Sequence, residues 1–191
     1  MPEVSEEHLD SMRKANIDFG FDLLRQLATT KNDNLAVSAL SIRAAFGMVH
    51  AMARGTTQRE NATALGFLDD SNATHQTLNH LDLTLDSRSL PANMEKDPVI
   101  YATANRMFVR PSLLPGSQLL DTLALHYGAG VFLTDFANDP EDVCNKINLW
   151  VSERTRMRIP MLFPAGSISA NTQWVLVNAL LTCPYLPVHL L

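Results

Sequence analysis

Histidine and cysteine are the residue types in this 191-residue chain that combine most readily into metal sites or nucleophile pairs. His75 and His80 stand five residues apart, whereas Cys144 and Cys183 lie much further along the chain. A structural zinc site needs four ligands that converge from close pairs, so we interpret both histidines as solvent-exposed side chains and predict no metal site. Two cysteines are too few for a disulfide framework, and we expect two free thiols.

Motifs of the common enzyme classes are absent from the sequence: it contains no G-x-S-x-G, Walker A, G-x-G-x-x-G or H-E-x-x-H pattern. Gly128-Ala129-Gly130 lies between a predicted helix and a predicted strand, the wrong order for phosphate binding, and predicts a turn. Arg154, Arg156 and Arg158 would suit a carboxylate ligand, although positive charge at a helix end is the commoner explanation. We therefore predict that the chain is not an enzyme and binds no cofactor.

The charge balance argues against nucleic acid as a partner. The chain has 15 Lys and Arg against 20 Asp and Glu, a net charge of -5, whereas phosphate binding needs clustered cations. No window is apolar over the length of a membrane span, so we expect no membrane partner. Residues 1–10 lack the basic start and apolar run of a signal peptide, which predicts a cytoplasmic protein as written and an extracellular one if a leader was removed.

The elements that position these residues are helical in the first half of the chain. Apolar residues recur at helical spacing over residues 9–27, and Asn34 to Ser38 is a short strand candidate. Ser41 predicts the N-cap of a second helix that Gly55 closes, and Thr57 with Glu60 offers a capping box for a third. Further helix is indicated for residues 69–82, and a loop for residues 87–97.

The second half alternates strands and helices. Strands are predicted over residues 99–109 and 131–136, with a helix over 119–127 between them. Asp139 followed by Pro140 is a strong helix start, and the apolar spacing predicts a buried face made by Val143, Ile147, Trp150 and Val151. A very apolar closing strand covers residues 174–181 and has the composition of an interior strand.

Six segments carry a family resemblance. Residues 16–23 (NIDFGFDL) look like an opening helix, 34–42 (NLAVSALSI) resemble N-x-x-x-S-P-L-S-I, and 53–57 (ARGTT) resemble G-A-R-G-x-T. Residues 104–108 (ANRMF) resemble A-N-x-L-F, 147–155 (INLWVSERT) resemble I-N-x-W-V-x-x-x-T, and 175–179 (VLVNA) resemble L-V-N-A. In this order they resemble the N-terminal half of the serpins, the serine protease inhibitors, with Asn105, Asn148, Trp150 and Thr155 as motif residues.

The resemblance implies an α+β fold in which N-terminal helices pack on part of a large mixed or antiparallel sheet. It also implies that Ser38, Ser41 and Asn178 lie under the centre of that sheet, the shutter region, where strands part and hydrogen-bond again. Serpins trap serine or cysteine proteases: an exposed reactive loop is attacked, and the cut loop inserts as a new strand into the sheet. A target protease is thus the implied partner.

The resemblance breaks off soon after Ala179. We therefore predict an incomplete serpin-like domain over residues 1–181 and a divergent tail over 182–191, and expect a frameshift or truncation near this point. Such a fragment lacks the reactive loop and is expected not to inhibit, with an open sheet edge suited to a C-terminal serpin segment or to self-association. The alternative is a binding module that completes its sheet by strand addition.

Two smaller departures from the family also carry expectations. Residues 69–80 match the helix that binds heparin in some relatives but contain no Lys or Arg, so no heparin binding is expected. Met157 stands where the family often has Gly, at a turn that we expect to need a positive φ.

Overall fold

The computed structural model describes residues 4–30, 34–85 and 100–183 of the chain. The chain divides into two compact units. Residues 1–84 and 121–127 form the helical unit, and residues 85–120 and 128–191 form the sheet unit. No helix in the described ranges combines the length and the apolar character that a membrane crossing requires.

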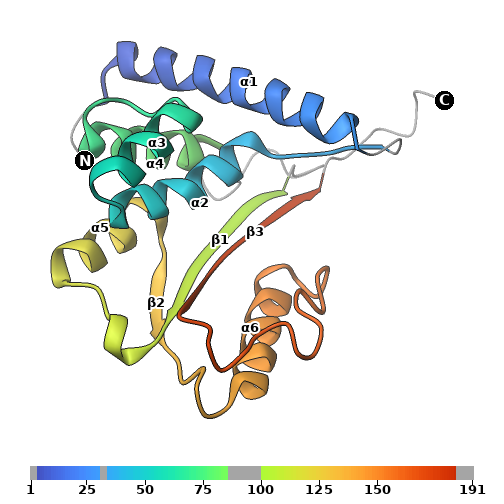
Figure 1. The fold of residues 1–191 in the computed structure, drawn as a ribbon. Helices are drawn as coiled ribbons and strands as arrows, with labels where there is room; N and C mark the ends of the chain where they lie inside the picture. The colour runs from blue at the N-terminus through green and yellow to red at the C-terminus, as the bar shows by residue number, and fades with distance from the viewer. Residues whose placement is uncertain (1–3, 31–33, 86–99, 184–191) are drawn as a thin grey trace, which may run out of the picture. The chain divides into compact units, whose positions relative to one another are not determined.

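The helical unit is built from consecutive helices (Figure 1). They are α1 (Glu6–Ala28), α2 (Ala39–Met52), α3 (Gly55–Leu65) and α4 (Ser71–Leu85). The C-terminal part of α5 (Ser117–Tyr127) also belongs to this unit. Helices α1, α2 and α3 contact one another. The helix predicted over residues 69–82 is confirmed as α4. The loop predicted over residues 87–97 lies outside the described residues.

The start of α2 corrects two predictions. Residues 34–38 are irregular and not a strand, and the N-cap of α2 is Ser38, not Ser41. The Ser38 Oγ accepts a hydrogen bond of 3.3 Å from the Ser41 backbone N–H, which puts Ser41 in the first turn. Both serines are good capping residues three positions apart, and the backbone hydrogen bond from Ile42 N to Ser38 O fixes the earlier one as the cap.

The junction between α2 and α3 also differs from the expectation. Helix α2 ends at Met52 and α3 already begins at Gly55, after an Arg54 N-cap that makes no side-chain cap hydrogen bond. Gly55 has φ 62°, a left-handed conformation that glycine adopts without strain. The predicted capping box of Thr57 and Glu60 is therefore wrong, because both residues lie inside the helix.

A buried arginine ties the first three helices together. Arg43 of α2 is fully buried, and its guanidinium donates to the backbone oxygens of Met12, Leu65 and Gly66 at 3.0, 2.9 and 3.3 Å. Leu65 and Gly66 are the last residue and the C-cap of α3, so these bonds satisfy carbonyls that a helix end leaves open. Burial lowers the pKa of Arg43 to about 10.

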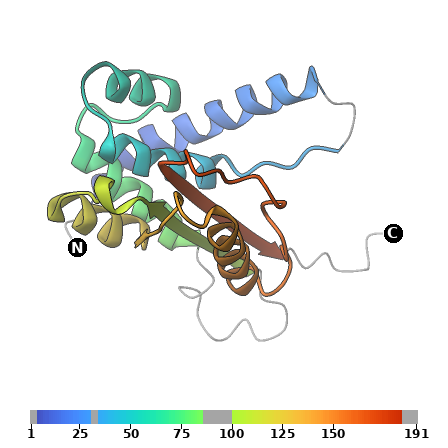
Figure 2. The ribbon, with the colours of Figure 1, turned by 60° about the horizontal axis from the view of Figure 1, so that its bottom comes forward.

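The sheet unit contains three strands in the order β2-β1-β3. β1 (Ile100–Val109) pairs in parallel with β2 (Gly130–Leu133) and antiparallel with β3 (Trp174–Cys183) over ten residue pairs. The arrows of β1 and β3 in Figure 2 point in opposite directions. The predicted strands are confirmed at these positions, although β2 ends at Leu133 and Phe136 lies beyond it in a turn.

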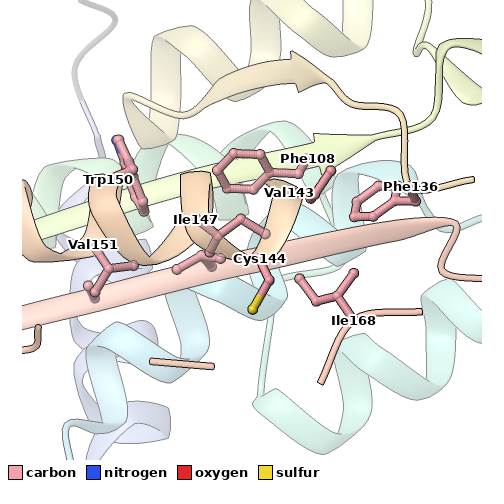
Figure 3. Packing of buried hydrophobic residues seen from close by; sticks show 10 residues of the cluster. Phe108, Phe136, Val143, Cys144, Ile147, Trp150, Val151 and Ile168 are labelled. Carbon is pink, nitrogen blue, oxygen red and sulfur yellow. The ribbon is translucent and has the colours of Figure 1, made fainter. Parts of the chain in front are cut away.

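Helix α6 (Pro140–Arg154) lies across β1 and β3, and the apolar core of the sheet unit forms between them (Figure 3). Asp139 caps α6 by accepting from the Asp142 N–H at 3.0 Å, as its sequence predicts. The predicted buried face is confirmed: Val143, Ile147, Trp150 and Val151 meet Phe108 of β1 and Val177 and Ala179 of β3. Alternate residues of β3 thus face α6.

Candidate functional site

Two asparagines face each other across the longest strand pair. Asn105 of β1 and Asn178 of β3 are in register, and the Asn178 Nδ2 donates to the Asn105 Oδ1 at 2.6 Å. Asn105 is buried, and the next pair along the ladder is Ala104 with Ala179, two small residues. The amide pair therefore adds a directional side-chain hydrogen bond across the β1–β3 ladder.

Asn148 fixes the segment that follows α6. Its Oδ1 accepts from the backbone N–H groups of Leu162 and Phe163, both at 2.9 Å, and its Nδ2 donates to the Phe163 oxygen at 2.8 Å. A single side chain thus satisfies three backbone groups of an irregular segment, which explains why an amide is needed here. Asn148 is a structural clamp in this geometry.

Trp150 forms one side of an aromatic and cationic stack. Its ring meets Phe108 edge-on, with centroids 6.2 Å apart. The Arg106 guanidinium lies 4.6 Å from the Trp150 ring centroid and 3.9 Å from that of Phe132, so β1, β2 and α6 meet at one cation. Burial, together with the nearby Arg154, lowers the pKa of Arg106.

Thr155 closes α6. Its Oγ1 donates to the Val151 oxygen at 2.8 Å and accepts from the Ile159 N–H at 3.1 Å, which holds the turn that follows. Arg156 and Met157 in that turn have φ of 51° and 63°. The positive φ expected at Met157 is therefore confirmed, in a region that glycine tolerates better than methionine.

The residues singled out from the sequence fall into two groups. Asn105 and Asn178 form a direct pair in the sheet unit, and Asn148, Trp150 and Thr155 line or close α6 there. Ser38 and Ser41 meet each other at the start of α2, in the helical unit. In the described residues these groups cap, clamp and bridge backbone segments, and none forms a nucleophile and base pair.

A row of histidine rings inside the helical unit escaped the sequence analysis. His75 of α4 is 5% exposed, and its ring centroid lies 5.9 Å from that of His50 and 6.1 Å from that of His126. Its Nδ1 shares a hydrogen bond of 2.6 Å with the Tyr127 hydroxyl, and its Nε2 shares one of 3.2 Å with Ser71 Oγ. The prediction of a solvent-exposed side chain is wrong for His75, whereas His80 is exposed.

Electrostatics explains why this histidine row is neutral at neutral pH. Burial is the main cause that lowers the pKa of His75 to about 4, and the adjacent His50 and His126 lower it further, against a weak opposing effect of Asp70. Burial also lowers the pKa of His50 and of His126. The described residues contain no cluster of three or more His, Cys, Asp or Glu side chains arranged to hold a metal ion.

Cys144 is a free and buried thiol at the core of the sheet unit. Burial, with the neighbouring Glu141, raises its pKa, so the thiol is protonated at neutral pH and is a poor nucleophile. The side chain of Cys183 lies outside the described part of the chain.

Comparisons with known proteins give one consistent family. The family model of the serpins, described as serine protease inhibitors, matches residues 14–182. Human Serpin B3 is 32% identical over 180 residues, which cover 90% of this chain and 46% of that protein. The leukocyte elastase inhibitor of Xenopus tropicalis is 31% identical over 175 residues, covering 90% of this chain and 44% of the relative.

Solved structures agree with this family at the level of the fold. The structure of human thyroxine-binding globulin has a TM-score of 0.75 and 27% identity, and the match covers 92% of this chain and 46% of that one. The chain thus spans about half the length of the curated relatives that it matches. Six α-helices and a three-stranded sheet in the described residues fit the incomplete α+β fold predicted from the sequence.

Proposed function

Because this chain belongs to the serpin family, we propose that it is part of a protease inhibitor that traps serine or cysteine proteases by insertion of a cleaved reactive loop. We further propose that these 191 residues do not inhibit by themselves. The leukocyte elastase inhibitor among its relatives carries protease inhibition in its name, which supports the first statement.

The observation that carries the proposal is the open edge of β3. This ten-residue strand is hydrogen-bonded to β1 on one side, and none of the described strands pairs with its other side. An edge of that length offers a row of backbone N–H and C=O groups to an added strand. In a trapping inhibitor the cleaved loop would be that added strand.

The predicted lack of inhibition by the 191 residues follows from the chemistry of trapping. A protease must first attack a bait peptide and form an acyl-enzyme, and the cut bait must then reach the sheet. No segment of this sequence after β3 resembles the family's reactive loop, and the relatives are about twice as long as the matched region. A target protease is therefore a partner of a longer chain.

The second statement can be tested with purified proteases. We would incubate the 191-residue chain with an elastase, a trypsin and a papain-type cysteine protease, and look for complexes that survive denaturing electrophoresis. We expect none, and expect protease activity to stay unchanged. A covalent complex formed by the 191 residues would contradict the second statement.

The native transcript tests the first statement independently, when it is read in all frames past the codon for Ala179. A frame that encodes the second half of a serpin should yield a chain that forms the complex with at least one protease class. The absence of inhibition by such a repaired chain would contradict the proposal that the parent is an inhibitor.

The same edge supports a second candidate function, a binding module that completes its sheet with a C-terminal serpin segment or with a second copy of itself. Amide hydrogen exchange over β3 distinguishes a free edge from one covered by an added strand. Alternate N–H groups of an edge strand point toward β1 and away from it. In a free chain every second amide should exchange quickly. Protection of all amides at high protein concentration would indicate strand addition, and an unchanged alternating pattern would contradict it.

We also propose that the serpin domain ends close to the boundary predicted between residues 181 and 182, and that the residues after β3 are a divergent tail. The family match ends at residue 182 and β3 ends at Cys183, which supports a boundary close to the predicted one. Removal of the last eight residues should leave the unfolding midpoint of the chain unchanged. A clearly lowered midpoint would contradict this boundary.

A further inference from the structure

A hollow of about 430 Å³ lies in the helical unit between α4 and α5. Two leucines from different helices line it, Leu83 of α4 at 37% exposed and Leu125 of α5 at 64% exposed. Exposed apolar side chains that gather at one concavity often mark a binding site. The volume falls in the range of pockets that hold small organic ligands, about 300–1,000 Å³.

The polar groups of the hollow are uncharged. The side chains of Asn72, Gln76 and Asn79 approach it from one face of α4, and those of His80 and His126 complete it. No Asp, Glu, Lys or Arg is among its lining residues, and the whole chain has a net charge of -5. A charged ligand would therefore lose its hydration without gaining a counter-charge.

His126 is the polar group best held in place. Its ring is stacked on His75 with an interplanar angle of 27°, and the Tyr127 hydroxyl and Ser71 in turn hold His75. The His126 Nδ1 is enclosed and has no hydrogen-bond partner among the described residues. His126 lines the pocket, and an imidazole can serve a ligand as a donor or an acceptor according to its tautomer.

We propose that this pocket binds a small, uncharged aromatic molecule that carries a hydroxyl group. Leu83 and Leu125 contact the ring of the ligand, and His126 forms a hydrogen bond with its hydroxyl. A hydroxyl both donates and accepts, so it matches either tautomer of the imidazole and also the carboxamides of α4. The recognition is of the kind in which an apolar pocket gives affinity and a few polar groups fix orientation.

Three naphthalene probes test the proposal on the full chain: 2-naphthol, naphthalene and naphthalene-2-sulfonate. Binding would be followed by NMR through the methyl signals of Leu83 and Leu125 and the ring signals of His126. We expect saturable binding of 2-naphthol at this site. Naphthalene should bind about three- to tenfold more weakly because it lacks the hydroxyl, and the sulfonate should bind more weakly still.

Matched variants locate the site. Leu125→Glu places a charge on an exposed pocket residue and should weaken 2-naphthol binding at least about tenfold. Leu149→Glu changes a leucine of similar exposure (61%) outside the pocket and should have no effect. His126→Phe keeps the ring that stacks on His75 but removes its nitrogens, and should reduce the affinity for 2-naphthol to that for naphthalene.

Several results would overturn the proposal. One is the absence of 2-naphthol binding up to its solubility limit. Another is equal affinity for 2-naphthol and naphthalene on the unmodified chain, which needs no variant and so does not depend on the folding of His126→Phe. A third is binding that Leu149→Glu weakens as much as Leu125→Glu does.

Discussion

The interiors of the two units differ in kind. In the helical unit the buried polar set is large and comprises Ser41, Arg43, His50, Thr74, His75 and Thr77. In the sheet unit the cluster between α6 and the strands is almost wholly apolar, and the buried polar residues described there are Asn105, Ser152 and Thr155. The helical unit therefore depends on hydrogen-bond geometry and protonation, whereas the sheet unit depends on filled volume.

This difference bears on the proposed function, in which the sheet of the longer inhibitor accepts a new strand. The apolar core between α6 and β3 is held by dispersion contacts, which depend on filled volume more than on direction. The polar interior of the helical unit allows few alternatives, because each buried donor needs its own acceptor. We infer that the helical unit is the stiffer of the two, and the following predictions test that contrast.

The largest effect is expected from Arg43→Ala. The substitution opens a cavity and leaves the carbonyls of Met12, Leu65 and Gly66 without the guanidinium that they accept from. We expect a loss of about 4 kcal/mol in unfolding free energy, measured by urea unfolding followed by far-ultraviolet circular dichroism. Arg13→Ala is the control, because the Arg13 ion pairs with Glu6 and Asp10 are exposed and should contribute less than about 1 kcal/mol. Similar losses for both variants would contradict the role of Arg43.

Ile147→Ala should have the next largest effect, and should act on the sheet unit. Ile147 is fully buried on α6, and its truncation should lower the unfolding free energy by about 3 kcal/mol through lost burial and a cavity. Both tryptophans of the chain, Trp150 and Trp174, belong to the sheet unit, so their fluorescence reports on this unit. The control is Leu149→Ala on the same helix, where the side chain is 61% exposed. This substitution should change the unfolding free energy by less than about 0.5 kcal/mol.

Acid should separate the two units. Burial lowers the pKa of His75 to about 4 in the folded chain, against 6.5 in the unfolded chain. Between these two pH values the unfolded chain binds a proton at His75 that the folded chain does not bind. Stability is thus unaffected above pH 6.5, falls by about 2 kcal/mol on acidification to about pH 5, and levels off near the folded pKa. Burial also lowers the pKa of His50 and of His126, so these residues add to the loss of stability in acid.

Two unfolding probes measure this acid effect. The midpoint followed by circular dichroism, which the helices dominate, should fall more on acidification than the midpoint followed by tryptophan fluorescence. His75→Gln should reduce the difference, and His80→Gln, at an exposed histidine of the same helix, should not. Coincident midpoints at every pH would show that the two units unfold together and would remove the proposed contrast.

Local signals made the sheet unit easier to predict than the helical unit. Asp139 and Pro140 start α6 through their own chemistry, and the apolar spacing of α6 gives its buried face directly. The burial of His75 depends instead on Tyr127, 52 residues further along the chain, and that of Arg43 on carbonyls 22 to 31 residues away. No periodicity encodes such partners. The sequence analysis also placed the N-cap of α2 at Ser41, whereas the hydrogen bonds of its first turn place it at Ser38.

The smallest effect is expected from Met157→Gly, which should be stabilising. Met157 holds φ at 63° and is 71% exposed, so glycine would remove left-handed strain and lose little beyond the weak hydrogen bond that the Met157 Sδ accepts from Ser152 Oγ at 3.0 Å. The greater freedom of glycine in the unfolded chain offsets part of this gain, which leaves about 0.5 kcal/mol in the tryptophan-detected unfolding of the sheet unit. Met161→Gly is the matched control, because Met161 is similarly exposed but has no positive φ, and it should be neutral or destabilising. A gain from both substitutions, or from neither, would show that the turn after Thr155 is not strained by its methionine.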